Sequence, residues 1–109
     1  MLKKILLGTA ATAFLLLGAA GPAHAARGTV DLFDNANFDW SAGGLSTSAE
    51  VGECVTLEPY MKNRVSSVRT NRTVILFDGD GCAAPSLTVT QSSSYVGWMN
   101  DRTNSFKII

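Results

Sequence analysis

Histidine is almost absent from this 109-residue sequence, in which the only one is His24. Since His24 lies in a segment that we expect to be removed, a Ser-His-Asp triad, a Cys-His pair and a His-ligated zinc site are excluded. Charge of either sign is also scarce, with 9 Lys and Arg against 9 Asp and Glu. This charge balance argues against nucleic-acid binding, which requires a basic face. We expect neither an enzyme nor a nucleic-acid-binding protein.

Residues 1–25 have the pattern of a secretory signal peptide. Lys3-Lys4 gives a positive start, an uncharged apolar run follows from Ile5 to Ala20, and Ala23-His24-Ala25 is a small-x-small cleavage site. The apolar run is short for a transmembrane span. We therefore expect a secreted, extracellular protein, with a mature chain of residues 26–109 that has no membrane segment. Its charge is 7 basic minus 9 acidic residues, which is −2.

Only two cysteines occur, Cys54 and Cys82. In a small exported domain, one such pair predicts a disulfide bond. The pair does not form a C-x-x-C motif and no histidine lies nearby, which disfavours a redox site. A bridge closing a loop of this length is expected to contribute about 3–4 kcal/mol to stability.

The mature chain is rich in threonine and serine, and its short β-prone runs are separated by clusters of Gly, Asn, Asp and Ser. Alternation of apolar and polar residues is clear in the runs around Leu87 and Phe106, and no stretch has a helical period with caps. These patterns predict an all-β fold. The predicted strands are residues 29–33, 54–57, 65–70, 73–77, 86–90 and 105–109.

The chain contains an internal duplication. Val30–Asp34 recurs as Val74–Asp78 with four of five residues identical, and Tyr60–Ser67 lines up with Trp98–Ser105. Two copies of about 40 residues predict two four-stranded Greek keys, residues 29–70 and 73–109, packed as one β-sandwich. The apolar residues expected to fill the shared core are Leu32, Phe33, Phe38, Leu57, Val65, Val68, Leu76, Phe77, Leu87, Val89, Trp98 and Phe106.

Each copy resembles the Greek-key motif of the βγ-crystallins. That motif has two aromatic residues near its first strand, matched by Phe33 and Phe38 in the first copy. In the second copy Phe77 matches the first aromatic residue and Cys82 stands in place of the other. It ends in a six-residue clamp of the form Asn/Asp-Asn/Asp-x-x-Ser/Thr-Ser. The clamps of this chain are Lys62–Ser67 (clamp one) and Asn100–Ser105 (clamp two).

The chain departs from the motif at one glycine. The glycine that relieves strain at the folded hairpin is replaced by Trp40 in the first copy and by Ala84 in the second. We expect Gly43 and Gly44 to provide the turn in the first copy, with a slightly longer hairpin.

The signal peptide, the doubled motif and the cysteine pair together resemble a family of small secreted bacterial peptidase inhibitors, named for members that block extracellular metalloproteinases. This resemblance implies a monomer that needs no cofactor and binds an extracellular peptidase through a rigid surface. The alternative is a calcium-binding or structural module of the cell exterior that has no peptidase target.

The crystallin resemblance also implies candidate calcium ligands. In calcium-binding crystallin domains each clamp supplies backbone and side-chain oxygens, and the fifth clamp position is a direct ligand. The matching residues are Asn63, Ser66, Asn100, Asp101 and Asn104. Each clamp has one defect, since Lys62 places a cation at a first position and Asn104 replaces a hydroxyl at a fifth. We slightly favour the interpretation that these residues only tie down the turns.

Four aromatic residues are candidates for a binding surface. Tyr60 and Trp98 occupy equivalent positions of the repeat, which indicates a structural corner or core role. Trp40 and Tyr95 have no such equivalence and are the better candidates for partner contact. The serine-rich segment Gln91–Gly97 is expected to be an exposed loop, either fitted to a peptidase cleft or simply solvated. Residues 34–37 and 78–81 are interpreted as hairpin turns rather than metal loops.

Overall fold

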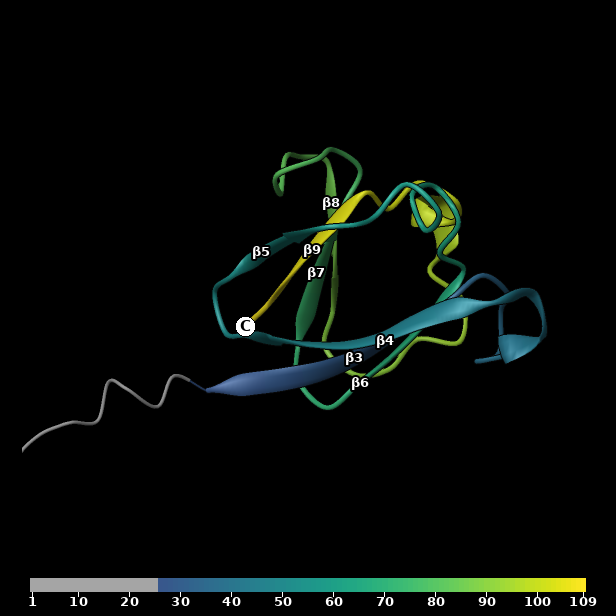
Figure 1. The fold of residues 1–109 in the computed structure, drawn as a ribbon, viewed down its shortest axis with the longest axis horizontal. Coiled ribbons are helices and arrows are strands. Elements are labelled where there is room, and N and C mark those ends of the chain that lie inside the picture. The colour runs from purple at the N-terminus through teal and green to yellow at the C-terminus, as the bar shows by residue number, and fades with distance from the viewer. Residues whose placement is uncertain (1–25) are drawn as a thin grey trace, which may run out of the picture.

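The computed structural model describes residues 26–109, so the predicted signal peptide and its cleavage site lie outside the described residues. Seven strands and two short 3-10 helices follow one another along this part of the chain (Figure 1). None of its helices is long and apolar enough to cross a membrane. The elements are β3 (Arg27–Phe33), η2 (Trp40–Ala42), β4 (Gly44–Glu50), β5 (Cys54–Thr56), β6 (Ser67–Thr70), β7 (Val74–Phe77), β8 (Ser86–Val89), η3 (Gly97–Met99) and β9 (Ser105–Ile108).

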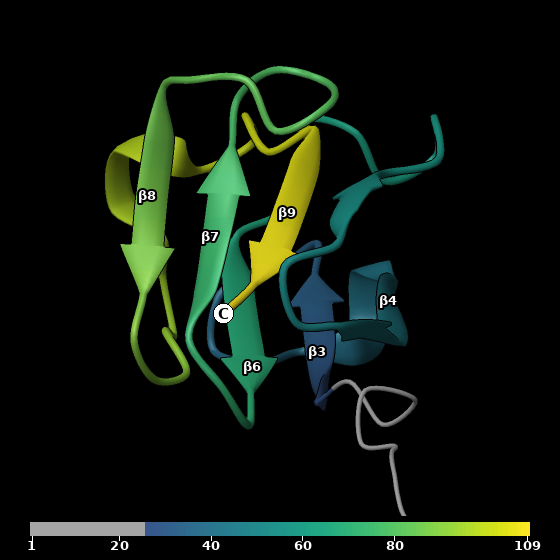
Figure 2. The same cartoon turned by 90° about the vertical axis from the view of Figure 1, so that its left-hand side faces the viewer.

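The strands form two antiparallel sheets. One has the order β4-β3-β6 and the other β5-β9-β7-β8. Figure 2 shows β8, β7 and β9 side by side in one layer, and Figure 1 shows β3, β4 and β6 together in the other. The predicted all-β sandwich is confirmed.

The two copies exchange their third strands. β5 belongs to the first copy but pairs with β9, the last strand of the second copy. The reciprocal segment of the second copy is reduced to one bridge between Val68 and Ser93, whose N–H and C=O groups bond at 2.9 and 2.7 Å. The second Greek key therefore has three regular strands and a single bridge, where the sequence predicted four strands.

The core lies between the sheets and draws on both copies. Val30 and Leu32 of β3 face Val74 and Leu76 of β7 within one buried cluster. Most of the predicted core residues are buried, but Phe38, Phe77 and Leu87 are only partly so. The assignment of Trp98 to the core was wrong: its side chain is 50% exposed, because it stands on η3 at the surface.

Strand β4 was not predicted. Its sequence is small and polar and buries only Ala49, so it lacks an apolar alternation. Pairing with β3 over seven residues holds it in place. At its start, a Cβ on Gly44 would lie 2.5 Å from the carbonyl oxygen of Leu32, and Gly43 has φ of 106°. Gly43 and Gly44 thus make the turn, as expected from the missing motif glycine.

The predicted disulfide is confirmed. Cys54 and Cys82 are bonded, with their Cα atoms 6.0 Å apart. The bond joins the edge strand β5 of the first copy to the connection between β7 and β8 of the second. It therefore links the two copies covalently beside the strand that they exchange.

Candidate functional site

The two clamps lie against each other with the same hydrogen bonds in both directions. The N–H of Asn63 donates to the carbonyl of Thr103, and the N–H of Asp101 donates to the carbonyl of Val65, both at 3.0 Å. Asn63 and Asp101 hold equivalent clamp positions and share φ of 60°. Asparagine and aspartate tolerate this left-handed conformation better than other side chains. The pairing places the candidate ligands of both clamps along one seam.

The last serine of each clamp fastens the hairpin of its own copy. Ser67 Oγ donates to the carbonyl of Asn35 (2.6 Å) and accepts from the N–H of Phe38 (3.1 Å). Ser105 Oγ makes the equivalent bonds with Gly79 (2.6 Å) and Cys82 (2.8 Å). Both serines are fully buried. Their hydroxyls satisfy backbone groups of loops in which Phe38 and Cys82 have positive φ, which costs such residues energy.

Three ion pairs surround the clamps. Arg64 pairs with Asp34, and Arg102 with Asp78 at 2.6 Å, again at equivalent positions of the two copies. Lys62 bridges the copies by pairing with Asp80 at 2.9 Å. The hydrogen bond that Arg64 donates to the Asp34 carboxylate, together with the negative charge of Asp34, raises the pKa of Arg64 above its usual value. Ion pairs that face solvent contribute little to stability.

Trp40, a predicted partner-contact residue, is about half exposed and packs against its own hairpin. Its ring centroid lies 4.3 Å from that of Phe33. Asp39 caps the helix η2 that carries Trp40, and the hydrogen bonds from Ser41, first its N–H and then its hydroxyl, lower the pKa of the Asp39 carboxyl. The free face of Trp40 can still meet a partner, but its packed face has a structural role.

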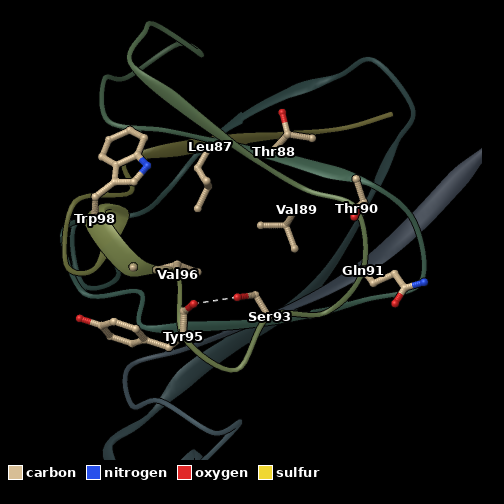
Figure 3. A pocket seen from close by; sticks show the side chains of 10 residues that line it. Leu87, Thr88, Val89, Thr90, Gln91, Ser93, Tyr95, Val96 and Trp98 are labelled. Carbon is tan, nitrogen blue, oxygen red and sulfur yellow. Dashed lines mark hydrogen bonds between the residues drawn. The ribbon is translucent and has the colours of Figure 1, made fainter.

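Tyr95, the other partner-contact candidate, borders a hollow of about 380 Å³ between β8 and the segment that follows it (Figure 3). Leu87 and Val89 point into this hollow from β8, while Trp98 stands at its side. Arg102 lies 5.5 Å from the centre of the Trp98 ring and holds that ring in a cation–π contact. No pattern in the sequence predicted this hollow. It exists because the chain leaves β8 after Val89 and meets the other sheet only at Ser93.

The hollow has an uncharged lining. It is formed by Leu87, Thr88, Val89, Thr90, Gln91, Ser93, Tyr95, Val96, Gly97 and Trp98.

Tyr60, which is equivalent to Trp98 in the repeat, lies instead beside a smaller depression of about 270 Å³ that also includes Asp34 and Arg64. Tyr60 and Trp98 are 56% and 50% exposed, so neither belongs to the core, while their predicted corner role stays a prediction.

No protein-family model matches the sequence, and no curated protein matches it. Solved structures do match it. A double mutant of a βγ-crystallin domain from Clostridium beijerinckii has a TM-score of 0.58 and 26% identity over 73% of this chain and 94% of that chain. A βγ-crystallin from Ciona intestinalis has a TM-score of 0.58 and 25% identity over 74% of this chain and 99% of that one.

The N-terminal domain of protein S also superposes, with a TM-score of 0.57 and 22% identity over 74% of this chain and 94% of that chain. The fold is that of a βγ-crystallin domain. The resemblance drawn from the duplicated motif is thereby confirmed for the fold.

Clamp two of this crystallin fold does not fit a calcium ion. The side-chain amide nitrogen of Asn104 donates to the carbonyl oxygen of Asp78 and, at 3.5 Å, to that of Arg102. An N–H donor aimed at these oxygens repels a cation that would need them as ligands. Asp78 is itself neutralised by the Arg102 guanidinium.

The remaining oxygen ligands come from both clamps. Ser66 carries a hydroxyl, and the Asp101 carboxylate accepts only a 3.3 Å bond from the Asn100 amide. The side-chain oxygen of Asn100 is buried without a hydrogen-bond partner. Calcium prefers six or more oxygens and several carboxylates. Within residues 26–109 no group of three His, Cys, Asp or Glu side chains comes together. One carboxylate with two neutral oxygens is a poor calcium site.

Proposed function

We propose that this crystallin domain is a secreted inhibitor that binds an extracellular peptidase, most simply a metalloproteinase, through the hollow beside β8 and the segment Gln91–Gly97. The observation that carries the proposal is the pair of exposed aromatic residues, Tyr95 and Trp98, at an uncharged hollow (Figure 3). Exposed aromatic side chains around a depression are typical anchors of protein interfaces.

The proposed contact segment is ordered before any partner binds. Ser93 forms its bridge to Val68, the N–H of Val96 donates to Ser66 at 3.0 Å, and the carbonyl of Ser94 accepts from Asn37 at 2.8 Å. Ordering a flexible loop on binding reduces affinity, so a segment fixed in this way suits an inhibitor. We assign the chain no catalytic step.

The test is a panel assay of the secreted, oxidised protein against thermolysin-like, serine and cysteine peptidases. We expect stoichiometric inhibition of one class. Trp98→Ala and Tyr95→Ala should each weaken inhibition about 30-fold, the effect of losing an interface anchor worth ~2 kcal/mol. Tyr60→Ala is the matched control, since Tyr60 is equally exposed but lies outside the hollow. Indifference of every class at micromolar protein rejects the proposal.

A structural module of the cell exterior is the second candidate. The observation that favours it is the reciprocal pairing of the clamps, which stabilises the domain without any ligand. Such a module shows no inhibition in the panel assay, so the same experiment separates the two candidates.

A further inference from the structure

We propose that the free edge of β8 and the adjacent hollow bind an extended, uncharged segment of the partner, which adds to the sheet as a fifth strand. This inference rests on the proposed function, since it specifies how the peptidase is held. Strand addition combines backbone hydrogen bonds with pockets for alternate side chains, and β8 offers both.

Some backbone N–H and C=O groups of β8 point away from its neighbour β7. Asp78 N–H donates to Pro85 O at 3.0 Å, in register with the pairs Leu76–Leu87 and Val74–Val89. Hydrogen-bonded pairs alternate in antiparallel strands, so Leu87 and Val89 bond to β7. The N–H and C=O groups of the intervening residue, Thr88, therefore point away from β7. Among residues 26–109, β8 has no partner strand on that side.

This edge lacks two of the usual protections against strand pairing, charge and proline. Ser86–Val89 and the two residues that follow contain no charged residue and no proline. Exposed sheet edges are normally blunted by charge, proline, short length or covering segments. The opposite edge strand of the same sheet, β5, has three residues and is tied down by Cys54. The edge of β8, which has neither charge nor proline, is therefore the one suited to a partner strand.

The hollow specifies the chemistry of the added segment. It lies directly beside the free edge, and its floor and walls include the buried Val89 and Val96 and the partly buried Leu87 (Figure 3). No charged side chain lines it, so a charged group placed there would lose hydration without gaining an ion pair. The occupant is accordingly an extended segment that places an apolar side chain between Tyr95 and Trp98.

The first test uses peptides and no peptidase. In a Trp40→Phe background Trp98 is the only tryptophan, and its fluorescence reports on the hollow. The probe is the uncharged peptide acetyl-TVTLTV-amide, with the central leucine exchanged for alanine or for aspartate in two further probes. We expect saturable binding with leucine above alanine, and none with aspartate. Absence of binding by the leucine peptide up to millimolar concentration overturns the inference.

The decisive variant is Thr88→Pro, which removes an outward N–H and leaves the bonds of Leu87 and Val89 to β7 intact. It should weaken peptide binding about fivefold to tenfold, the effect of about one lost hydrogen bond. The matched control is Ser48→Pro on β4, the free edge of the other sheet. There the bonds Asp34 N–Gly43 O and Val51 N–Ala26 O set the same alternation, so Ser48 also faces outward. Equal weakening by both variants overturns the inference.

Amide shifts of the unaltered protein provide a measurement that does not depend on whether Thr88→Pro folds. Adding the leucine peptide should move the signals of Thr88, Tyr95 and Trp98, whereas movement confined to other strands contradicts the inference. A concentration-dependent dimer through β8, seen in sedimentation, would show that the occupant is a second copy and overturn it as well.

The peptidase panel separates this inference from the proposed function. If a peptidase is inhibited equally by the unaltered protein and by Thr88→Pro, the inhibitor function stands and the strand-addition mode is wrong. If the peptide binds at β8 but no peptidase is inhibited, the edge site stands and the inhibitor function is wrong.

Discussion

Two buried serine hydroxyls, Ser67 and Ser105, explain why the clamp sequence ends as it does. A hydroxyl can donate and accept at once, and each of these serves a carbonyl and an N–H of its hairpin. Alanine would leave both backbone groups without their partner in a buried setting. A larger polar residue would not fit, because both side chains are fully enclosed.

We expect Ser67→Ala and Ser105→Ala each to lower the free energy of unfolding by about 1–3 kcal/mol, the cost of unsatisfied buried polar groups. Denaturant titration followed by tryptophan fluorescence measures this loss. Ser94→Ala is the control, since its side chain is exposed and only its backbone carbonyl is used. A loss below the error of the control at both positions contradicts the role given to the hydroxyls.

The side-chain amide of Asn104 predicts that calcium stabilises the protein only weakly. Because it donates to the carbonyls of Asp78 and Arg102, we expect millimolar calcium to raise the melting temperature of chelator-treated protein by less than about 3 °C, as for a site with millimolar affinity. Asn104→Asp replaces the donor by a carboxylate and should enlarge the response. Magnesium is the control ion. A rise above about 10 °C in the unaltered protein, lost in Asp101→Ala, would instead establish the clamps as calcium sites.

Strands with apolar alternation or a repeat partner were predictable from sequence, and those without either were not. β3 and β7 repeat each other, so both were found near their observed bounds. β4 buries only Ala49 and forms because β3 lies beside it, which no local pattern records. The hollow was not predictable either, because it depends on the path that the chain takes from Val89 to Ser93 between the two sheets.

Strand β5 depends on the disulfide more than on packing. It has three residues, none fully buried, and within the described part of the chain it pairs only with β9. We expect Cys54→Ser with Cys82→Ser to cost about 3–4 kcal/mol and to lower the melting temperature by about 10–30 °C. Differential scanning calorimetry measures the shift. Mass spectrometry of the unaltered protein should first show a mass that is two hydrogens below that of the reduced chain. Free thiols there would refute the bond.

The duplicated halves form one interlocked unit rather than two small domains. β5 of the first half completes the sheet of the second, and Ser93 of the second bridges to β6 of the first. The buried cluster takes Val30 and Leu32 from one half and Val74 and Leu76 from the other. A unit of about 40 residues rarely has enough buried surface to fold alone. The clamp pairing and the disulfide cross the same boundary.

This interlocking predicts a single cooperative unfolding transition of the oxidised domain. Its calorimetric and van't Hoff enthalpies should agree, at about 60 kcal/mol near 60 °C for a chain of this size. Separate peptides of residues 26–72 and 73–109 should each lack a cooperative transition, because each would lose the strand that the other supplies. Two resolved transitions in the whole domain, or a folded half, would show that the copies are independent and that the exchanged strands do not determine stability.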